Sequence, residues 1–481
     1  MSTRITILGA GSGGYIAAIR AAQLGAQLTL IERDAIGGTC LNWGCIPTKT
    51  LKTTAELMEK LSRARELGVE VDGEVRPNMA RLMARKQEVI DNLATAILRI
   101  LNSYKIQYMK GEGYVLEPTK VRVKGMDNGT VDVISDKLIL AMGSRPLSIP
   151  AFPFDGERIL SSDDAINLRE VPESILILGG GIIGCEFAFI LNRLGSRVTL
   201  VEAMPRLMPM PSIDKDCSAV IQREMRKRKI QVLLNRTIQK VELTKGRVQA
   251  TTEPSPFAQG LKESEKRPLA LEVEKILVCI GRQPNTEGIG LDQLGLEMDT
   301  GGWIVANERM ETNVPNVYAV GDVLGPSKIM LAHVAFAEGM VAAENALGGN
   351  GRMNYDLVPT AVFTFPEVAS VGKTEDQARE CGFDVRADTF LFRALGRAQA
   401  TGEIAGQVKI ISDAQTKRIL GVHIVGPHAA DLISEGTVAI KMGATASDLA
   451  ETIHAHPTFS EALMEASHKA LDAGLHYLKE D

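Results

Sequence analysis

The chain of 481 residues is poor in aromatic side chains and in cysteine, and it contains no long apolar run. Phe, Trp and Tyr together make up 4% of the residues, and the six cysteines are too few for a disulfide scaffold in a chain of this length. No apolar run reaches the roughly 18 residues that a membrane-spanning helix needs. The N-terminus shows neither a signal peptide nor a transit peptide. These absences predict a cytoplasmic protein that does not act in a membrane; a mature organellar protein would show the same absences.

The chain also lacks an excess of positive charge, with a formal net charge of -5 at pH 7. Such a balance gives no general attraction to nucleic acid or to anionic lipid. One basic run, Arg226–Lys229, lies in a helical pattern without interleaved aromatics, which is typical of a solvated helix face. We therefore expect no nucleic-acid partner. The length exceeds that of a single core and indicates three or four domains.

One sequence unit occurs twice in the chain. In each copy an apolar strand pattern leads into a glycine-rich turn of the form G-x-G-x-x-G and then into a helix-like run. The glycines are Gly9, Gly11 and Gly14 in the first copy, and Gly179, Gly181 and Gly184 in the second. Such a turn lets the backbone approach a pyrophosphate, which lies at the N-terminus of the helix. Two copies in this context predict two dinucleotide sites.

An acidic residue ends the second strand of each unit. Glu32 follows Gly9 by 23 positions, and Glu202 follows Gly179 by the same number. A carboxylate at this position accepts hydrogen bonds from a ribose diol and repels a 2′-phosphate. Arg206 lies nearby and could favour NADP, but Glu202 holds the decisive position. The second site is therefore expected to bind NAD.

The two units also end in the same way. The segment Lys137–Pro146 parallels Lys275–Pro284, because each is an apolar strand pattern closed by a glycine and a proline. We expect these two exits to lie at domain borders. The polar stretch Glu253–Pro268, shortly before the second exit, is expected to be a solvated hairpin or loop.

A pair of cysteines, Cys40 and Cys45, follows the first unit. Their spacing allows a small disulfide loop. The residues after Cys45 have a helical pattern, and a helix N-terminus with Lys49 close by favours a thiolate and thus thiol–disulfide exchange. A zinc site would need a second ligand pair, and a structural disulfide is unexpected in a reducing compartment. The pair is therefore predicted to be redox-active, with no metal.

Over nearly its whole length the sequence resembles the flavoprotein pyridine nucleotide–disulfide oxidoreductases. The motifs that carry the resemblance are Gly9–Gly14, Gly38–Lys49, Gly179–Glu186, Ala319–Asp322, Met330–His333 and His454–Glu461. Within this family the sequence is most similar to the dihydrolipoamide dehydrogenases. The cysteine pair is present, Glu202 favours NAD over NADPH, and no cysteine follows Cys381.

The resemblance implies oxidation of dihydrolipoamide with FAD and NAD as cofactors. It implies as partner a lipoyl-bearing domain of a 2-oxoacid dehydrogenase or glycine-cleavage complex. A glutathione- or mercuric-reductase-like enzyme is the alternative, and a non-catalytic subunit of a lipoyl complex is another. Phe365 and Ile453 depart from the pattern of the family, since relatives often have a polar residue and a cysteine there.

The implied fold is α/β, with two Rossmann-like dinucleotide-binding domains, for FAD and NAD, and a C-terminal α+β dimerisation domain. The expected parts are residues 1–147 for the first part of the FAD domain, 148–276 for the NAD domain, 277–348 for a return segment, and 349–481 for dimerisation. Two borders lie at the exits that end in Pro146 and Pro284, and the third lies at the glycine-rich break that starts at Gly348.

The resemblance assigns cofactor contacts to motif residues. For FAD these are Gly9, Gly11, Gly14, Glu32, Lys49, Gly113, Met142, Gly143, Ser144, Asp322, Met330, Leu331, Ala332 and His333. For NAD they are Gly179, Gly181, Gly184, Glu186, Glu202, Ile238 and Gly281. Glu32 is expected at the adenosine ribose and Asp322 at the ribityl chain. Met330–His333 is expected to present backbone amides to the flavin.

The same resemblance assigns the chemistry. Cys45 is expected to lie against the flavin as the charge-transfer thiol, and Cys40 is expected to exchange with the substrate. Lys49 and Glu186 are expected to meet near flavin N5.

The expected general base comes from the far C-terminus. His456 precedes Pro457, which suits a helix start, so Glu461 would lie in the first turns and orient the imidazole. His454 is the competing candidate. In this family the histidine–glutamate pair of one subunit faces the disulfide of the other, so the resemblance implies an obligate homodimer.

Overall fold

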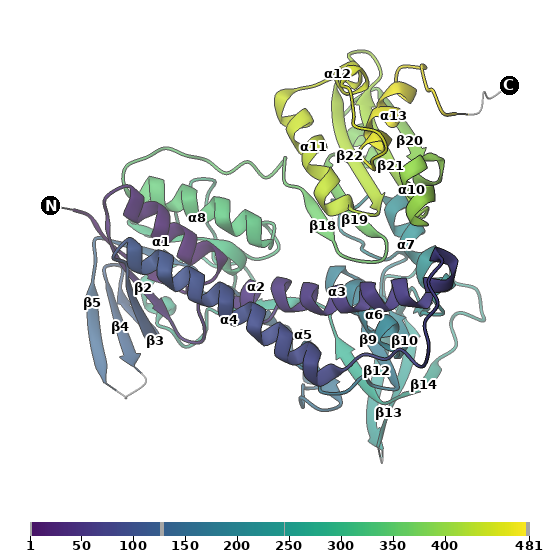
Figure 1. Ribbon diagram of the computed structural model, residues 1–481. Coiled ribbons are helices and arrows are strands. Elements are labelled where there is room, and N and C mark those ends of the chain that lie inside the picture. Colours follow the sequence, from purple (N-terminus) through teal and green to yellow (C-terminus); the bar gives the residue numbers. More distant parts are fainter. Residues whose placement is uncertain (1, 126–128, 245, 478–481) are drawn as a thin grey trace.

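Three main sheets, each covered by helices, organise the chain in the computed structural model (Figure 1). The structure describes residues 2–125, 129–244 and 246–477. Two of the sheets have a parallel core, and each starts from one copy of the repeated unit. The third is antiparallel and is formed by the C-terminal part of the chain.

The first sheet has the strand order β17-β6-β1-β2-β3-β4-β5. Its parallel strands are β1 (Arg4–Leu8), β2 (Gln27–Glu32), β3 (Gln107–Glu117), β6 (Lys137–Leu140) and β17 (Val317–Ala319). An antiparallel extension consists of β4 (Lys120–Gly125) and β5 (Thr130–Ile134). Helices α1 (Ser12–Gln23) and α8 (Ala332–Ala346) pack against each other beside this sheet. β17 and α8 come from a segment nearly 200 residues after β6, so the chain leaves this region and returns to it.

The second sheet repeats this plan, with the order β11-β10-β9-β15-β8. Its strands are β8 (Ile159–Leu160), β9 (Ser174–Leu178), β10 (Arg197–Val201), β11 (Gln231–Leu233) and β15 (Lys275–Val278). A separate antiparallel sheet packs on it through an apolar layer and consists of β12 (Arg236–Thr244), β13 (Arg247–Pro254) and β14 (Leu269–Val273). Residues 255–268, between β13 and β14, contain no regular strand, which confirms the predicted loop except for Glu253 and Pro254, the last residues of β13.

The two exits, which are similar in sequence, pair directly with each other in the structure. β7 (Ser144–Pro146) and β16 (Arg282–Pro284) form a two-stranded antiparallel sheet in which the two prolines cap opposite ends. The chain thus leaves the first region through β7 and returns to it through β16, and these two strands lie side by side.

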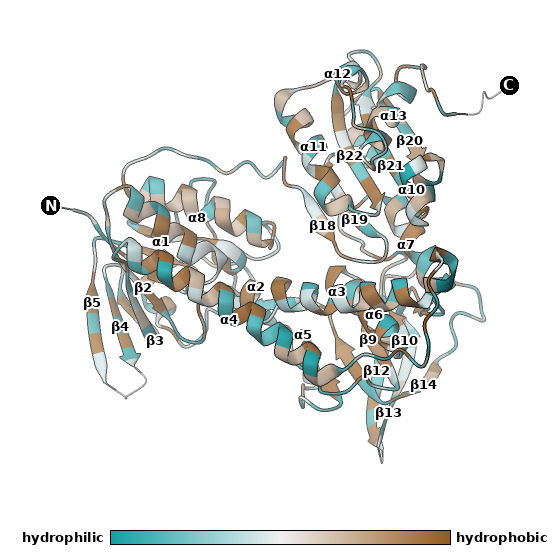
Figure 2. Ribbon diagram, viewed as in Figure 1, coloured by the Kyte–Doolittle hydropathy of each residue, from teal (hydrophilic) through white to brown (hydrophobic). Residues whose placement is uncertain are grey.

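Two long helices connect the first region to the second. α3 (Cys45–Ser62) runs along α6 (Ile182–Leu194), and Leu51 and Ala55 of α3 share an apolar core with Phe187 of α6. α4 (Met79–Ser103) packs on α3 and has a mostly exposed outer face, so polar and apolar residues alternate along it in Figure 2. This arrangement brings the start of α3 close to the start of α6.

The C-terminal sheet has the order β18-β19-β22-β21-β20. Its strands are β18 (Thr360–Val362), β19 (Glu367–Gly372), β20 (Val385–Leu391), β21 (Gln407–Asp413) and β22 (Ile419–Gly426). Five α-helices of the described residues accompany it: α9 (Glu375–Glu380), α10 (Gly396–Thr401), α11 (Ala429–Met442), α12 (Ala446–Glu451) and α13 (Glu461–Lys469). The segment between α12 and α13 carries both candidate histidines, His454 and His456.

The basic run Arg226–Lys229 was expected to be a solvated helix face, and this expectation is wrong for one of its residues. Helix α7 (Lys215–Lys227) ends inside the run, and three of the four side chains are exposed. Arg228, in contrast, turns inward and forms ion pairs with Glu224 at 2.7 Å and Glu59 at 3.2 Å. Since Glu224 is buried, it needs a cationic partner, and the helical pattern alone does not reveal this. None of the helices in the described ranges is long and apolar enough to cross a membrane.

Candidate active site

The two glycine-rich turns have the same geometry. Gly9 and Gly179 have φ angles of +102° and +100°, in the region that favours glycine. A Cβ atom on Gly14 would lie 1.9 Å from the carbonyl oxygen of Gly9, and one on Gly184 would lie 1.9 Å from that of Gly179. Both pairs must therefore remain glycine for the turn to close.

The middle glycines differ, because the fold itself does not require them. Gly11 and Gly181 precede α1 and α6 with φ angles of -71° and -74°, which any residue adopts. A Cβ on Gly11 would meet only Gly38 at 3.8 Å, and one on Gly181 would meet nothing within 4 Å. Their lack of a side chain keeps the N-terminus of each helix open, as a bound pyrophosphate requires.

The acidic residues at the strand ends also match. Glu32 accepts hydrogen bonds from the backbone N–H of Ala10 at 2.7 Å and of Asp34 at 2.8 Å. Glu202 accepts them from Gly180 at 2.5 Å and Met204 at 2.8 Å. Each carboxylate is thus held beside its own glycine turn. Burial raises the pKa of Glu32 from its ordinary value.

Arg206 is not directed toward Glu202. Its guanidinium donates hydrogen bonds to the carbonyl oxygens of Met208 and Met210 and to the Ser218 hydroxyl, at 2.8 to 3.1 Å. These bonds occupy the cation that could otherwise have paired with a 2′-phosphate.

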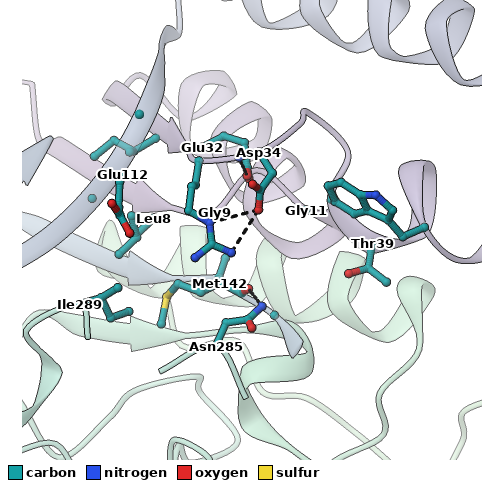
Figure 3. A pocket seen from close by; sticks show the side chains of 18 residues that line it. Leu8, Gly9, Gly11, Glu32, Asp34, Thr39, Glu112, Met142, Asn285 and Ile289 are labelled. Carbon is teal, nitrogen blue, oxygen red and sulfur yellow. Dashed lines mark hydrogen bonds and ion pairs between the residues drawn. The ribbon is translucent and has the colours of Figure 1, made fainter. Parts of the chain in front are cut away.

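A pocket opens at the carboxyl ends of β1 and β2 (Figure 3). Six residues predicted to contact FAD line it: Gly9, Gly11, Glu32, Gly113, Met142 and Gly143. Asn285 closes one side and donates a hydrogen bond from its amide to the carbonyl oxygen of Met142 at 2.9 Å. The mixture of apolar walls with convergent polar groups suits a cofactor site.

Several lining residues were not predicted from the sequence. They are Leu8, Ile31, Arg33, Asp34, Gly38, Thr39, Trp43, Gly111, Glu112, Ala141, Asn285 and Ile289. Thr39 and Trp43 lie within the cysteine motif, and Asn285 follows the exit proline, so their positions in the motifs could have indicated them. Glu112 comes from β3, and no sequence signal marks it.

Ser144 and Asp322 do not line this pocket but contact each other. The Ser144 hydroxyl donates to the Asp322 carboxylate at 2.8 Å, and Arg282 donates to the same hydroxyl at 2.6 Å. The segment Met330–His333 was expected to present backbone amides to the flavin. In the structure the N–H of Leu331 instead donates a hydrogen bond to the carbonyl oxygen of Ile329 at 2.9 Å.

The Cys40–Cys45 pair lies next to the first glycine turn. Cys40 is in the short helix α2 (Gly38–Asn42), and Cys45 is the first residue of α3, as the helical pattern predicted. Both are free thiols. A hydrogen bond from Cys40, together with the charge of Lys49, lowers the pKa of Cys45 to about 7. The same hydrogen bond, together with burial, raises the pKa of Cys40, so Cys45 is the thiol that ionises.

Lys49 and Glu186 meet, as predicted. The Lys49 ammonium lies 3.1 Å and 3.0 Å from the two carboxylate oxygens of Glu186. Lys49 is one turn into α3 after Cys45, and Glu186 is in the first turns of α6. The ion pair therefore joins the two dinucleotide-binding regions.

The two candidate histidines have different environments. His456 Nδ1 lies 2.8 Å from Glu461 Oε1, and the His456 side chain is 76% exposed, so its other nitrogen faces solvent. His454 is only 5% exposed, and its nitrogens bond to Glu435 and to the carbonyl oxygen of Thr452. Only His456 is available to a substrate. Glu461 is the first residue of α13, so it lies in the first turn as predicted, but the helix begins four residues after Pro457 and not at Pro457 as expected.

The His456 segment belongs to the C-terminal sheet. α13 packs on α12, β20 and β21. In Figure 1 it lies at the far end of this sheet, whereas α2 and α3 cross the middle of the molecule. The chain therefore presents the histidine and the cysteine pair on separate parts of its surface.

The remaining predicted NAD residues lie in the second region. Gly281 has a φ of +142° just before β16, and Ile238 lies on β12 at a register shift, partly buried against the second sheet. Within the described ranges, no group of three or more His, Cys, Asp or Glu side chains could hold a metal ion.

Two family models match the chain. The first, described as pyridine nucleotide-disulphide oxidoreductase, covers residues 3–339. The second, for the dimerisation domain of the same family, covers residues 358–467. Together they span both glycine turns, the cysteine pair and the His456 segment.

Curated relatives are similar over nearly the full length. Dihydrolipoyl dehydrogenase 1, mitochondrial, from Arabidopsis thaliana is 40% identical over 98% of this chain and 91% of its own. Dihydrolipoyl dehydrogenase from Thermus scotoductus is 40% identical over 98% of both chains. Dihydrolipoyl dehydrogenase from Bacillus subtilis is 39% identical over 98% of this chain and 99% of its own.

Solved structures give the same picture. LpdA from Mycobacterium tuberculosis superposes with a TM-score of 0.87 at 28% identity, over 97% of this chain and 99% of that one. The flavoprotein disulfide reductase RclA from Escherichia coli superposes with a TM-score of 0.82 at 28% identity, over 96% and 99% of the two chains.

Proposed function

The chain belongs to the pyridine nucleotide-disulphide oxidoreductase family, and we propose that it acts as a homodimeric dihydrolipoyl dehydrogenase. It oxidises dihydrolipoamide to lipoamide and reduces NAD⁺, with FAD as its resident cofactor. The observation that carries this function is the position of Cys45, whose depressed pKa and proximity to Lys49 suit a thiolate that leaves and re-forms at each turnover.

The substrate half of the reaction is thiol–disulfide exchange. In the oxidised enzyme the two sulfurs form a disulfide, and a substrate thiolate attacks the Cys40 sulfur, so that Cys45 leaves as a thiolate. The second substrate thiol then attacks the substrate sulfur bound to Cys40. Lipoamide forms as a cyclic disulfide, and Cys40 is released. The enzyme gains two electrons, and both pass to it from the substrate.

His456 removes the proton from the attacking thiol. Its exposed nitrogen can accept that proton, and the Glu461 carboxylate at 2.8 Å orients the ring and stabilises the imidazolium. Lys49 favours the Cys45 thiolate electrostatically. Held at the first glycine turn and the pocket beside it, FAD would supply two-electron redox chemistry between the dithiol and NAD⁺.

The cofactors are held by the two copies of the repeated unit. The first glycine turn, Glu32 and the pocket beside them bind FAD, with Asp322 and Ser144 as a further polar contact. The second turn and Glu202 bind NAD, and the occupied guanidinium of Arg206 supports NAD over NADP. Ile238 and Gly281 complete this NAD site.

The dimer completes the active site. His456 and Glu461 of one subunit serve the Cys40–Cys45 pair of the other, which accounts for the separation of the two groups within one chain. The matched dimerisation domain contains both residues of the pair. The macromolecular partner is a lipoyl-bearing domain of a 2-oxoacid dehydrogenase or glycine-cleavage complex.

One assay separates this function from its nearest alternative. Purified enzyme is given dihydrolipoamide with NAD⁺ and, separately, glutathione disulfide with NADPH. The proposal predicts rapid NADH formation in the first assay and negligible NADPH oxidation in the second. The opposite pattern would assign the chain to the disulfide reductases.

A further inference from the structure

A short turn of the C-terminal sheet contacts the Lys49–Glu186 ion pair. The turn connects β18 to β19, which lie directly above α3 in Figure 1. The backbone N–H of Phe363 in this turn donates a hydrogen bond to Glu186 Oε1 at 2.9 Å. The ring of the same residue lies 4.3 Å from the Lys49 ammonium. One residue thus touches both charges.

These contacts restrict the ion pair from two sides. Glu186 is 5% exposed, and its carboxylate receives both the Lys49 ammonium and the Phe363 amide. The Lys49 side chain is 31% exposed. The face of the Phe363 ring covers part of its ammonium that water would otherwise solvate. A cation over an aromatic face is attracted by the ring quadrupole. Without the ring, the flexible lysine stem would allow the ammonium to move toward solvent.

A neighbouring cation does not compete for this role. Lys52 lies 5.5 Å from the Phe363 ring, but its ammonium is already paired with Glu56 at 2.6 Å and Glu367 at 2.8 Å. Within the part of the chain that the structure describes, Glu186 is the carboxylate paired with Lys49. The position of Lys49 therefore depends on Glu186 and Phe363.

We propose that Phe363 is a positioning residue, whose ring and backbone amide hold the Lys49 charge at a fixed place beside Cys45. As a role in dihydrolipoamide oxidation, this rests on the proposed function. Its chemistry, however, is local: the fixed ammonium stabilises the Cys45 thiolate, and Glu186 is kept from rotating away. The C-terminal domain thereby contributes to the reactivity of a cysteine in the first domain.

The same turn provides a matched control. Phe365 is 9% exposed and packs edge-to-face on Phe189 of α6, with ring centroids 6.0 Å apart. It lies 5.6 Å from Lys52, and it holds the turn against the second region by apolar packing. Phe365→Leu therefore loses apolar packing at this junction but keeps the Phe363 ring over Lys49.

The test measures Cys45 reactivity in the purified, FAD-loaded enzyme without any substrate. The enzyme is reduced anaerobically with a phosphine and alkylated with iodoacetamide over a pH series, and peptide mass spectrometry follows Cys45 alone. Phe363→Leu is expected to raise the pH midpoint and to slow alkylation at pH 7 by about twofold to fivefold. Phe363→Tyr keeps the ring face and is expected to restore the wild-type profile, and Phe365→Leu is expected to leave the midpoint unchanged.

Two results would overturn the proposal: an unchanged midpoint in Phe363→Leu, or an equal shift in Phe363→Leu and Phe365→Leu. Because no substrate is present, these results are independent of the enzymatic assignment. An enzyme that fails to oxidise dihydrolipoamide but shows the expected shift would refute the function and retain the positioning role. An enzyme that oxidises dihydrolipoamide but shows no shift of the midpoint would support the function and refute the positioning role.

Discussion

His456 Nδ1 lies 2.8 Å from Glu461 Oε1, while both ring nitrogens of His454 are engaged, with Glu435 and with the carbonyl oxygen of Thr452. Because one ring nitrogen of His456 has no such partner among the described residues, we expect His456, and not His454, to act as the base. His456→Gln is expected to lower kcat/KM for dihydrolipoamide by about 10²- to 10⁴-fold, because the attacking thiol loses its proton acceptor.

Oxidation of NADH by ferricyanide needs no base at the disulfide, so His456→Gln should retain it. His454→Gln serves as the control and should mainly lower the melting temperature, because both hydrogen bonds of this largely buried side chain are disturbed. Equal loss of dihydrolipoamide activity in the two variants would contradict the assignment.

The pKa of Cys45, lowered to about 7 by Cys40 and Lys49, predicts a pH-dependent reactivity. The thiolate fraction rises through pH 7, so alkylation of Cys45 in the reduced enzyme should show its midpoint there. Lys49→Met removes a stabilising charge and should raise the midpoint by about 1 pH unit. Lys60→Met, near the exposed end of the same helix, should not. A midpoint near 9 in the wild-type enzyme would disprove the thiolate assignment.

Glu338 predicts a pH-dependent contribution to stability. Its buried carboxylate on α8 accepts hydrogen bonds from the Tyr355 hydroxyl and the Gly321 N–H, both at 2.6 Å. Burial raises its pKa from 4.5 to about 7, so the folded state binds this proton more tightly than the unfolded state. The stabilisation is present below pH 4.5 and is lost as the pH rises through 7. The loss amounts to about 3 kcal/mol.

Glu338→Gln removes this titration. The free energy of unfolding of the variant, relative to wild type, should therefore increase between pH 4.5 and pH 8, whatever the constant offset from altered hydrogen bonds. Glu344→Gln, at the surface of the same helix beside Arg20, provides the control. Parallel stability curves for wild type and Glu338→Gln would show that the carboxyl does not titrate in this range.

The repeated unit provides an internal control for cofactor choice. Glu202→Gln should lower kcat/KM for NAD⁺ by about tenfold and relieve the repulsion of NADP⁺, because the ribose diol loses an ionised acceptor. Glu32→Gln is the equivalent change in the first unit and should weaken FAD retention while leaving the NAD⁺/NADP⁺ ratio unchanged. A wild-type enzyme that uses both nucleotides equally would show that Glu202 does not select the cofactor.

Local signals account for the parts of the site that the sequence predicted. The glycine turns, the acidic strand ends and the helix that begins at Cys45 each depend on a few neighbouring residues, so their pattern determines their geometry. The meeting of Lys49 with Glu186 was expected only through family resemblance. In the structure it follows from the packing of α3 along α6.

Contacts between distant elements were not predictable in this way. Phe363 touches Lys49 only because the C-terminal sheet docks above α3, and no periodicity in residues 360–367 encodes that docking. Glu112 enters the pocket from the third strand of a sheet, and Arg228 turns toward a buried carboxylate that its own helix supplies. Each depends on tertiary packing, which sequence patterns do not specify.

Mixed dimers test most directly the central claim, that Cys40 of one subunit works with His456 of the other. Cys40→Ser and His456→Ala subunits, each with a different tag, are co-expressed, and the heterodimer is purified through both tags. Each homodimer should be nearly inactive with dihydrolipoamide. The heterodimer contains one site with both residues intact if the site is shared, and about half of the wild-type activity is then expected. A heterodimer as inactive as the two homodimers would contradict the account.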